Sequence, residues 1–166
     1  AVETAIAWQQ ALQFKGPTAL ALSRQKLPHQ HRSDDQLSAV ARGGYILREP
    51  DGKVDTILMS TGSEVAIACE AADLLAAEGL QVRVVSMPST DVFLTQDQAY
   101  RDSVLPVDLR RRVAIEAGHP DSWFRFVGLD GMVVGLERFG VSGPINDVYE
   151  SLGITAQRVA EVARGL

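Results

Sequence analysis

The 166-residue sequence has a single cysteine, Cys69, so no disulfide can form within the chain. It also has no apolar run that approaches the ~20 residues a membrane-spanning helix needs. We find no charged-then-apolar opening segment of the kind that directs secretion. We therefore expect a soluble, cytoplasmic protein that does not act in a membrane. A compact chain of this length can bury roughly 70% of its unfolded surface, so it needs neither disulfides nor metal to fold.

The sequence also lacks an excess of basic residues, since its formal net charge is −5. Nucleic-acid-binding domains usually carry a basic stripe, so we expect no nucleic-acid partner. The densest basic run is Arg110-Arg111-Arg112, which directly precedes an apolar segment. We interpret this run as a solvated entrance to a strand, with phosphate binding as the alternative.

Short apolar runs alternate along the chain with segments of helical periodicity. We expect strands over 18–22, 45–47, 54–59, 82–85, 113–115 and 132–134. Alternating strands and helices imply mostly parallel pairing, with helices on both faces of the sheet. Pro50-Asp51-Gly52 is a turn sequence, so we expect strand 54–59 to pair antiparallel with strand 45–47 at one edge. The predicted fold class is a three-layer α/β/α domain.

The helix starts follow local signals. Ser33 with Gln36, and Thr95 with Gln98, have the spacing of capping boxes. The first residues already run at helical spacing from Val2 without a good preceding cap. We therefore expect this chain to be a piece of a longer protein.

Arg24 is the strongest candidate for a binding residue. It closely follows the apolar run 18–22, and open α/β sheets bind ligands at the carboxyl ends of their strands. A guanidinium there can hold a phosphate or carboxylate through two hydrogen bonds. The alternative, which the residue pattern alone favours, is an ordinary salt bridge at a surface or interface.

The segment Thr61-Gly62-Ser63-Glu64 lies between a predicted strand and a predicted helix, where a helix N-terminus attracts anions. Glu64, however, puts negative charge where a phosphate group would sit. We therefore favour helix capping by Thr61 or Ser63, with Glu64 favourable to the helix dipole.

Three other candidates have simpler structural interpretations. His29 and His31 are potential metal ligands, but no carboxylate or cysteine lies at matching spacing, and we expect a solvated loop. Cys69 falls on the apolar face of a predicted helix, so we expect an unreactive core thiol. Glu116 precedes His119 and the pair could do acid–base chemistry, although we favour a structural role for the carboxylate.

A group of aromatic residues indicates either core packing or a subunit contact. Its members are Trp123, Phe124, Phe126 and Phe139.

Seven segments, in order along the chain, resemble the C-terminal part of transketolase. They are 16–20 with 22–25, 41–45, 61–65, 84–89, 103–106, 116–118, and 139–140 with 142 and 144. The resemblance implies that residues 1–33 are the tail of the pyrimidine-binding domain and a linker, and that 34–166 are the C-terminal domain. It also implies a mostly parallel five-stranded sheet with one antiparallel edge strand.

Transketolase transfers a two-carbon ketol unit between a ketose phosphate and an aldose phosphate in the pentose phosphate pathway. The resemblance implies a homodimeric parent enzyme that uses thiamine diphosphate as its electron sink together with Mg²⁺. It places the cofactor site, the activating glutamate and most substrate-handling histidines before residue 1. We therefore expect no cofactor, metal ion or catalytic residue in this chain, and no activity from it alone.

Of the family's functional residues, only the arginine that contacts the substrate phosphate carries over, onto Arg24. Phe126 departs from the family pattern, where tyrosine is common, and His119-Pro120 alters the loop after Glu116; both changes concern packing or an interface. The rival hypothesis is a stand-alone regulatory or interaction module that binds a small anion at the strand ends.

Overall fold

The computed structural model describes residues 2–166, so Ala1, the first residue of the predicted segment 1–33, lies outside the described residues. The strands are β1 (Tyr45–Arg48), β2 (Thr56–Ser60), β3 (Val82–Ser86), β4 (Arg112–Ile115) and β5 (Met132–Val134). The helices are α1 (Val2–Gln13), α2 (Asp34–Val40), α3 (Glu64–Ala77), α4 (Thr90–Leu94), α5 (Gln98–Val104), the 3₁₀ helix η1 (Pro120–Trp123), α6 (Phe124–Val127), α7 (Ile145–Ser151) and α8 (Ala156–Arg164).

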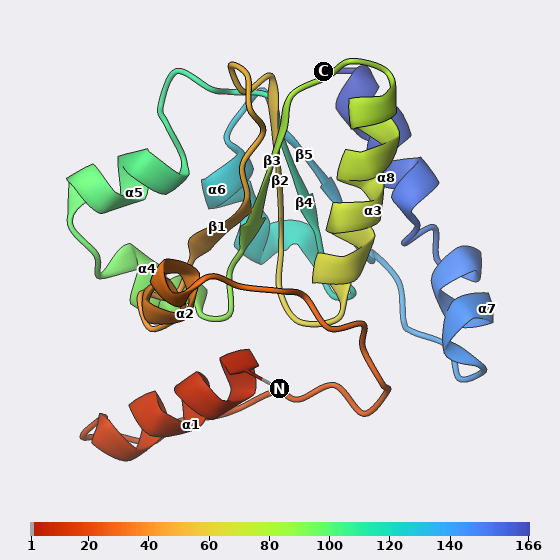
Figure 1. Cartoon of the computed structure of the whole chain (residues 1–166). Coiled ribbons are helices and arrows are strands. Elements are labelled where there is room, and N and C mark those ends of the chain that lie inside the picture. Colours follow the sequence, from red (N-terminus) through yellow and green to blue (C-terminus); the bar gives the residue numbers. More distant parts are fainter. Residues whose placement is uncertain (1) are drawn as a thin grey trace.

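The strands form one sheet in the order β1-β3-β2-β4-β5 (Figure 1). β3, β2, β4 and β5 run parallel, whereas β1 is antiparallel to β3 at one edge. This confirms the five-stranded, mostly parallel sheet with one antiparallel edge strand. The predicted hairpin between β1 and β2 is wrong. β2 is buried at all five positions, and both of its edges are taken by β3 and β4, so none is left for β1.

Helices cover both faces of the sheet, as Figure 1 shows. Successive side chains of a strand point to opposite faces. Leu58 of β2 accordingly lies in one core cluster with residues of α3 and α8, whereas its neighbours Ile57 and Met59 lie in a second cluster with residues of α4, α5 and α6. Both central strands, β2 and β3, are buried at all five positions, and their apolar residues outnumber the buried polar ones, which are Thr56, Ser60, Arg83 and Ser86. The three-layer α/β/α arrangement is confirmed.

α1 lies beyond the edge of the sheet at which the parallel strands end (Figure 1). Glu3, Ile6 and Gln10 share one side of this helix because they are three and four positions apart. Ile6 packs against the core, and the Gln10 side chain donates a hydrogen bond to the carbonyl of Ala41. On another side of α1, Leu12 is 80% exposed.

The predicted strand over 18–22 is wrong. These residues form no strand, and Leu22 is 58% exposed. A strand needs a neighbouring strand edge to satisfy its backbone hydrogen bonds. Within residues 2–166, this run pairs with neither of the edge strands of the sheet, β1 and β5.

The capping box predicted at Ser33 is confirmed, whereas the one predicted at Thr95 is wrong. Ser33 and Gln36 form the predicted capping box at α2. Thr95 does not cap α5, whose first turn is capped by Asp97. The reason is a short helix that the sequence did not indicate: α4 ends at Leu94, and the Thr95 hydroxyl donates to the carbonyl of Val92 within it.

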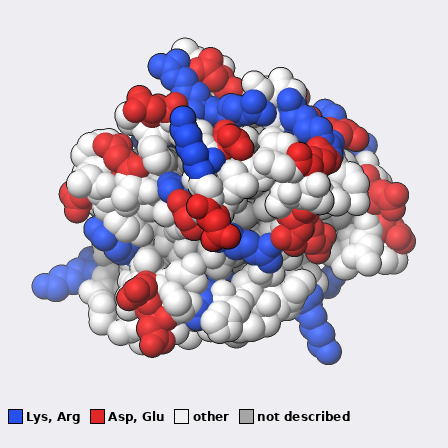
Figure 2. Space-filling model, turned by 45° about the horizontal axis from the view of Figure 1, so that its top comes forward, with Lys and Arg blue, Asp and Glu red and all other residues white. Residues whose placement is uncertain are grey.

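Charged side chains of both signs are interspersed over the face shown in Figure 2, and no single basic patch gathers there. Among residues 2–166, no helix has the length and apolar character that crossing a bilayer requires.

Candidate functional site

Arg24 lies in the irregular segment that leads from α1 to α2, and its side chain is exposed. Within the described part of the chain we find no hydrogen bond or ion pair for its guanidinium, so the salt bridge considered from the sequence is not formed there. A guanidinium in this state keeps all its donors for a ligand or for another chain segment.

The residue before Arg24 approaches the N-terminal end of α3. The Oγ of Ser23 lies 3.9 Å from the position that a Cβ would occupy at Gly62, in the turn between β2 and α3. Arg24 is therefore held near the carboxyl edge of the sheet, although no strand of its own leads to it.

The first residue of α3, Glu64, carries a buried carboxylate. Glu64 is only 3% exposed, and its Oε1 accepts hydrogen bonds from Ser63 Oγ at 2.6 Å and from the Tyr149 hydroxyl at 2.7 Å. The predicted side-chain cap is not formed by Ser63, because its backbone is already helical (φ −66°, ψ −32°) and its hydroxyl turns to donate to Glu64. Glu64 does occupy the first turn, where negative charge is favourable.

Burial is the main reason why the pKa of Tyr149 rises to about 12. The Ser63 hydroxyl, whose oxygen lies 3.0 Å from that of Tyr149, acts in the opposite direction, whereas the bond to Glu64 raises this pKa further. Tyr149 therefore stays protonated at neutral pH and remains a hydrogen-bond donor to Glu64.

A second polar group, the Glu3 cluster, consists of Glu3, Arg32, Tyr45 and Ser86. Glu3 Oε1 accepts from Arg32 Nη2 at 3.0 Å, from the Tyr45 hydroxyl at 2.7 Å and from Ser86 Oγ at 2.6 Å. Arg32 Nε also donates to the Tyr45 oxygen at 2.6 Å. Burial and the charge of Glu3 raise the pKa of Tyr45, so its hydroxyl stays protonated. The cluster fastens α1 to the carboxyl edge of the sheet.

Glu116 follows β4 and accepts a hydrogen bond from the indole Nε1 of Trp123 at 2.8 Å. Burial raises the pKa of Glu116; Trp123 lowers it, and the charge of Glu64 raises it. His119 is exposed and lies beside Asp121, with 3.4 Å between Nδ1 and Oδ2. Because no hydrogen bond joins Glu116 to His119 among residues 2–166, the arrangement favours the structural role for Glu116.

The remaining candidates take structural positions. Burial raises the pKa of the Cys69 thiol, which lies in the core as predicted. His29 and His31 are exposed in the irregular segment. Within residues 2–166, no group of three or more His, Cys, Asp or Glu side chains is placed to hold a metal ion.

The aromatic group divides between core and surface. Trp123 and Phe126 are buried, with ring centroids 5.8 Å apart in an edge-to-face arrangement. Phe124 and Phe139 are exposed, Phe139 at 96%. Core packing therefore explains one half of the group, and a contact surface stays open for the other.

The run Arg110-Arg111-Arg112 binds protein groups. Arg110 pairs with Asp130 at 3.1 Å on the surface, and Arg111 donates to the carbonyl of Ala163. The Arg112 guanidinium donates to the backbone carbonyls of Leu105, Pro106, Leu109 and Phe126. Of the three, only Arg110 is the solvated residue that was expected. Arg112, at the start of β4, instead links this strand to the backbone of the neighbouring loops.

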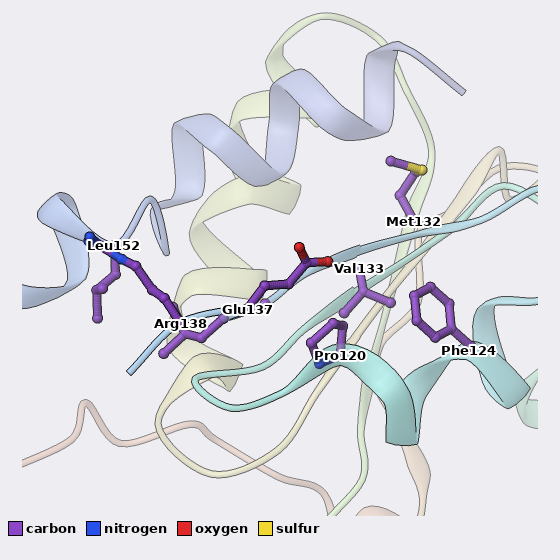
Figure 3. Close-up of a pocket in the computed structure, with 9 residues that line it drawn as sticks. Pro120, Phe124, Met132, Val133, Glu137, Arg138 and Leu152 are labelled. Atoms are coloured by element: carbon purple, nitrogen blue, oxygen red, sulfur yellow. The ribbon is translucent and has the colours of Figure 1, made fainter. Parts of the chain in front are cut away.

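Two hollows lie in the surface near the residues described above. The larger, of about 440 Å³, lies along β5 at the edge of the sheet and is lined by Pro120, Phe124, Met132, Val133, Glu137, Arg138 and Leu152, among others (Figure 3). Polar and apolar atoms contribute about equally to its surface, and its charged groups come from two adjacent residues, Glu137 and Arg138. The smaller, of about 280 Å³, lies between residues 27–32, the start of α1 and the start of α3. It shows that the irregular segment runs alongside α3.

Residues 43–155 match the family model described as a transketolase-like C-terminal domain. The chain belongs to the transketolase family. It is 51% identical over 166 residues to Transketolase 1 of Vibrio vulnificus (strain YJ016), a match that covers 99% of this chain and 25% of the Vibrio protein. It is 48% identical over 163 residues to Transketolase 2 of Escherichia coli (strain K12), covering 98% and 24%.

Solved transketolases have the same fold. The transketolase from Leishmania mexicana superposes with a TM-score of 0.90 at 36% identity, covering 99% of this chain and 24% of that chain. A Pichia stipitis transketolase in complex with sedoheptulose-7-phosphate gives a TM-score of 0.88 at 33% identity, covering 98% and 23%. This chain thus spans about a quarter of the length of the transketolases that it matches.

The transketolase resemblance pointed to Arg24 but not to the groups around it. The Glu3 cluster and the Ser63–Glu64–Tyr149 contacts were missed, because Glu3 and Ser86 are 83 residues apart and Glu64 and Tyr149 are 85 residues apart. Only the polar residue types at the strand ends, such as Ser86, signalled that something hydrophilic had to lie there.

Proposed function

We propose that this chain is the C-terminal quarter of a transketolase that transfers a two-carbon ketol unit between ketose and aldose phosphates in the pentose phosphate pathway. The observation that carries the proposal is similarity to transketolases along almost the whole chain, joined to coverage of 25% of their length. In the parent enzyme, bound thiamine diphosphate supplies the electron sink for the carbanion. Residues 1–33 are the tail of the preceding domain with a linker, and 34–166 are the C-terminal domain.

The residues of this chain do not fit that cofactor and its Mg²⁺. Within residues 2–166 no group of acidic, histidine or cysteine side chains is arranged for a metal ion. We therefore derive no catalytic step through thiamine diphosphate from these residues, and the proposal assigns cofactor and metal to other domains of the parent. The chain alone is proposed to be inactive, with a structural role.

Arg24 is proposed as the residue that contacts the substrate phosphate. Its guanidinium is exposed and unpaired within residues 2–166, and it stands near the carboxyl edge of the sheet. A planar guanidinium can hold two phosphate oxygens at once. The Pichia stipitis transketolase was solved with a sugar phosphate, sedoheptulose-7-phosphate, which is the class of ligand that such a residue suits.

The remaining domains of the parent are proposed to cover the outer side of α1. Trp8 and Leu12 are exposed there, and Phe14, Leu22 and Leu27 are exposed in the segment that follows. Exposed apolar side chains gathered on one segment are typical of a contact surface. A homodimeric, cytoplasmic parent completes the proposal, as the family implies.

Replacing Arg24 by alanine in the full-length parent tests the assigned contact. Losing a charge-assisted phosphate contact should cost about 1.5–3 kcal/mol, which is roughly 10- to 150-fold in kcat/KM for phosphorylated substrates. Unphosphorylated substrates should be nearly unaffected. Arg110→Ala is the matched control, since Arg110 is also exposed but pairs with Asp130. An equal loss with both substrate classes would show that Arg24 is a structural residue.

Calorimetric titration of the isolated chain separates this proposal from the stand-alone binding module. Sugar phosphates and nucleotides are the ligands to titrate, because both offer a phosphate group to Arg24. We expect no binding in the micromolar range. Micromolar binding would favour the binding module.

A further inference from the structure

The chain between β5 and α7 carries exposed apolar side chains. Residues 135–144 are irregular, and Phe139 and Val141 within them are 96% and 51% exposed. Ile145, the first residue of α7, continues the group and is 40% exposed. Single exposed apolar residues are common on protein surfaces, whereas several that gather in one place indicate a contact. Phe139, Val141 and Ile145 are called the α7-loop surface below.

The backbone of this segment leaves room for a second surface. Gly140 lies between the two most exposed side chains, and its φ is not positive. Apart from its chain neighbours, a Cβ at this position would meet no atom of residues 2–166 within 4 Å. Neither a left-handed backbone nor crowding within the described chain therefore requires glycine here. A glycine does allow another surface to approach the backbone closely.

The α7-loop surface adjoins the segment that carries Arg24. Ile145 and Tyr149 are four positions apart and therefore share one side of α7. The Tyr149 hydroxyl lies 3.0 Å from Ser63 Oγ, and Ser63 lines the smaller hollow together with Leu27, which is 42% exposed. In Figure 1 the chain after β5 leaves the sheet at the same edge beyond which α1 lies. The two exposed apolar regions thus meet at the start of α3.

The position of Arg24 indicates what covers this surface. In the proposed function, its guanidinium meets the phosphate of a substrate that must also reach the cofactor. The domains that hold the cofactor therefore come within the length of one sugar phosphate of Arg24. This chain covers 25% of Transketolase 1 of Vibrio vulnificus, so three quarters of such a protein is available to form the covering.

We propose that the α7-loop surface docks against the cofactor-holding domains that precede α1 in the same parent polypeptide, with Phe139 as its central contact. The parent then holds this chain at two places, along the outer side of α1 and at the α7-loop surface. The inference rests on the proposed function, because it takes the position of the cofactor relative to Arg24 from there.

Photo-crosslinking of the full-length parent identifies what lies against Phe139. Benzoylphenylalanine, an aromatic amino acid that cross-links to adjacent C–H groups under ultraviolet light, replaces Phe139 in one variant and Leu129 in another. Leu129 is the matched control, because it is fully exposed and precedes β5, at the opposite edge of the sheet. We expect the variant at Phe139 to cross-link, within one polypeptide, to the sequence before α1, and the variant at Leu129 to give no such product. A cross-link that joins two polypeptides, or none at Phe139, would overturn the inference.

Thermal unfolding of the parent gives a second readout. Phe139→Ser should lower its melting temperature by roughly 3 °C or more, the effect of losing one buried phenylalanine contact in a unit of this size, whereas Leu129→Ser should leave it unchanged. Equal shifts in the two variants would count against the docking surface. A parent that transfers no ketol unit would overturn the proposed function. If the parent is active and Phe139 cross-links to nothing, only the docking surface is lost.

Discussion

The Glu116 carboxylate accepts a hydrogen bond from the buried indole of Trp123 at 2.8 Å, and the charge of Glu64 also acts on it. Burial is the largest effect on this group and raises its pKa above the ordinary value near 4.5; Trp123 partly offsets it. The folded chain therefore binds a proton at Glu116 more tightly than the unfolded chain does. Ionisation of Glu116 therefore lowers the free energy of unfolding.

This has a consequence for pH dependence. The stabilising effect of protonated Glu116 is fully present below a pH of about 4.5, and it is lost as the pH rises through the higher pKa of the folded chain. Glu116→Gln keeps an acceptor for Trp123 and has no charge to bury. The melting temperature of this variant relative to wild type should therefore be higher at neutral pH than below pH 4.5.

Thermal unfolding at both pH values, with Glu150→Gln as an exposed control, measures this difference. A shift in melting temperature that is the same at both pH values would show that Glu116 is not destabilised by its surroundings.

At the level of elements, the Glu3 cluster joins α1, β1, β3 and the segment before α2. Three hydrogen bonds converge on one carboxylate oxygen, and the Arg32 side chain that donates one of them is only 8% exposed. Hydrogen bonds to charged groups contribute more than neutral ones, and more when water is excluded. The cluster is therefore the main polar contact that fixes α1 on the sheet.

Glu3→Gln should destabilise the chain by about 1.5–3 kcal/mol, because Arg32 is left buried without a negative partner. Urea unfolding of the 166-residue chain measures the loss. Asp130→Asn, which breaks the exposed pair with Arg110, should cost less than about 1 kcal/mol. If the two variants lose equal stability, the cluster does not hold α1.

Most elements of the sheet could be predicted from the sequence, because short apolar runs and helical periodicity report burial directly. Pairing could not. The turn at Pro50–Gly52 reverses the chain locally, but β1 pairs with β3 because the edges of β2 are already occupied. The run 18–22 has the composition of a strand, yet a strand forms only where another edge completes its hydrogen bonds.

The site was predictable to a lesser degree. Arg24 was singled out by its place after an apolar run and by the family resemblance. Tyr149 and Glu3 were not, because their partners lie far away in the sequence and polar contacts of this kind leave no periodic signal. Glu64 was expected to complement the helix dipole, and its use of Ser63 and Tyr149 followed only from the fold.

For the whole molecule, the fold is that of the C-terminal domain of transketolases, with α1 and the following segment attached at its carboxyl edge. This attachment brings Arg24 to the domain, while the apolar outer side of α1 remains exposed. This exposed apolar side is where we propose that the other domains of the parent pack.

The most direct test of this account is an assay of ketol transfer from a ketose phosphate to an aldose phosphate, with thiamine diphosphate and Mg²⁺ supplied. The full-length parent and the 166-residue chain are compared at equal concentration. We expect turnover by the parent and none above background by the chain. Turnover by the chain alone, or a parent that transfers no ketol unit, would contradict the account.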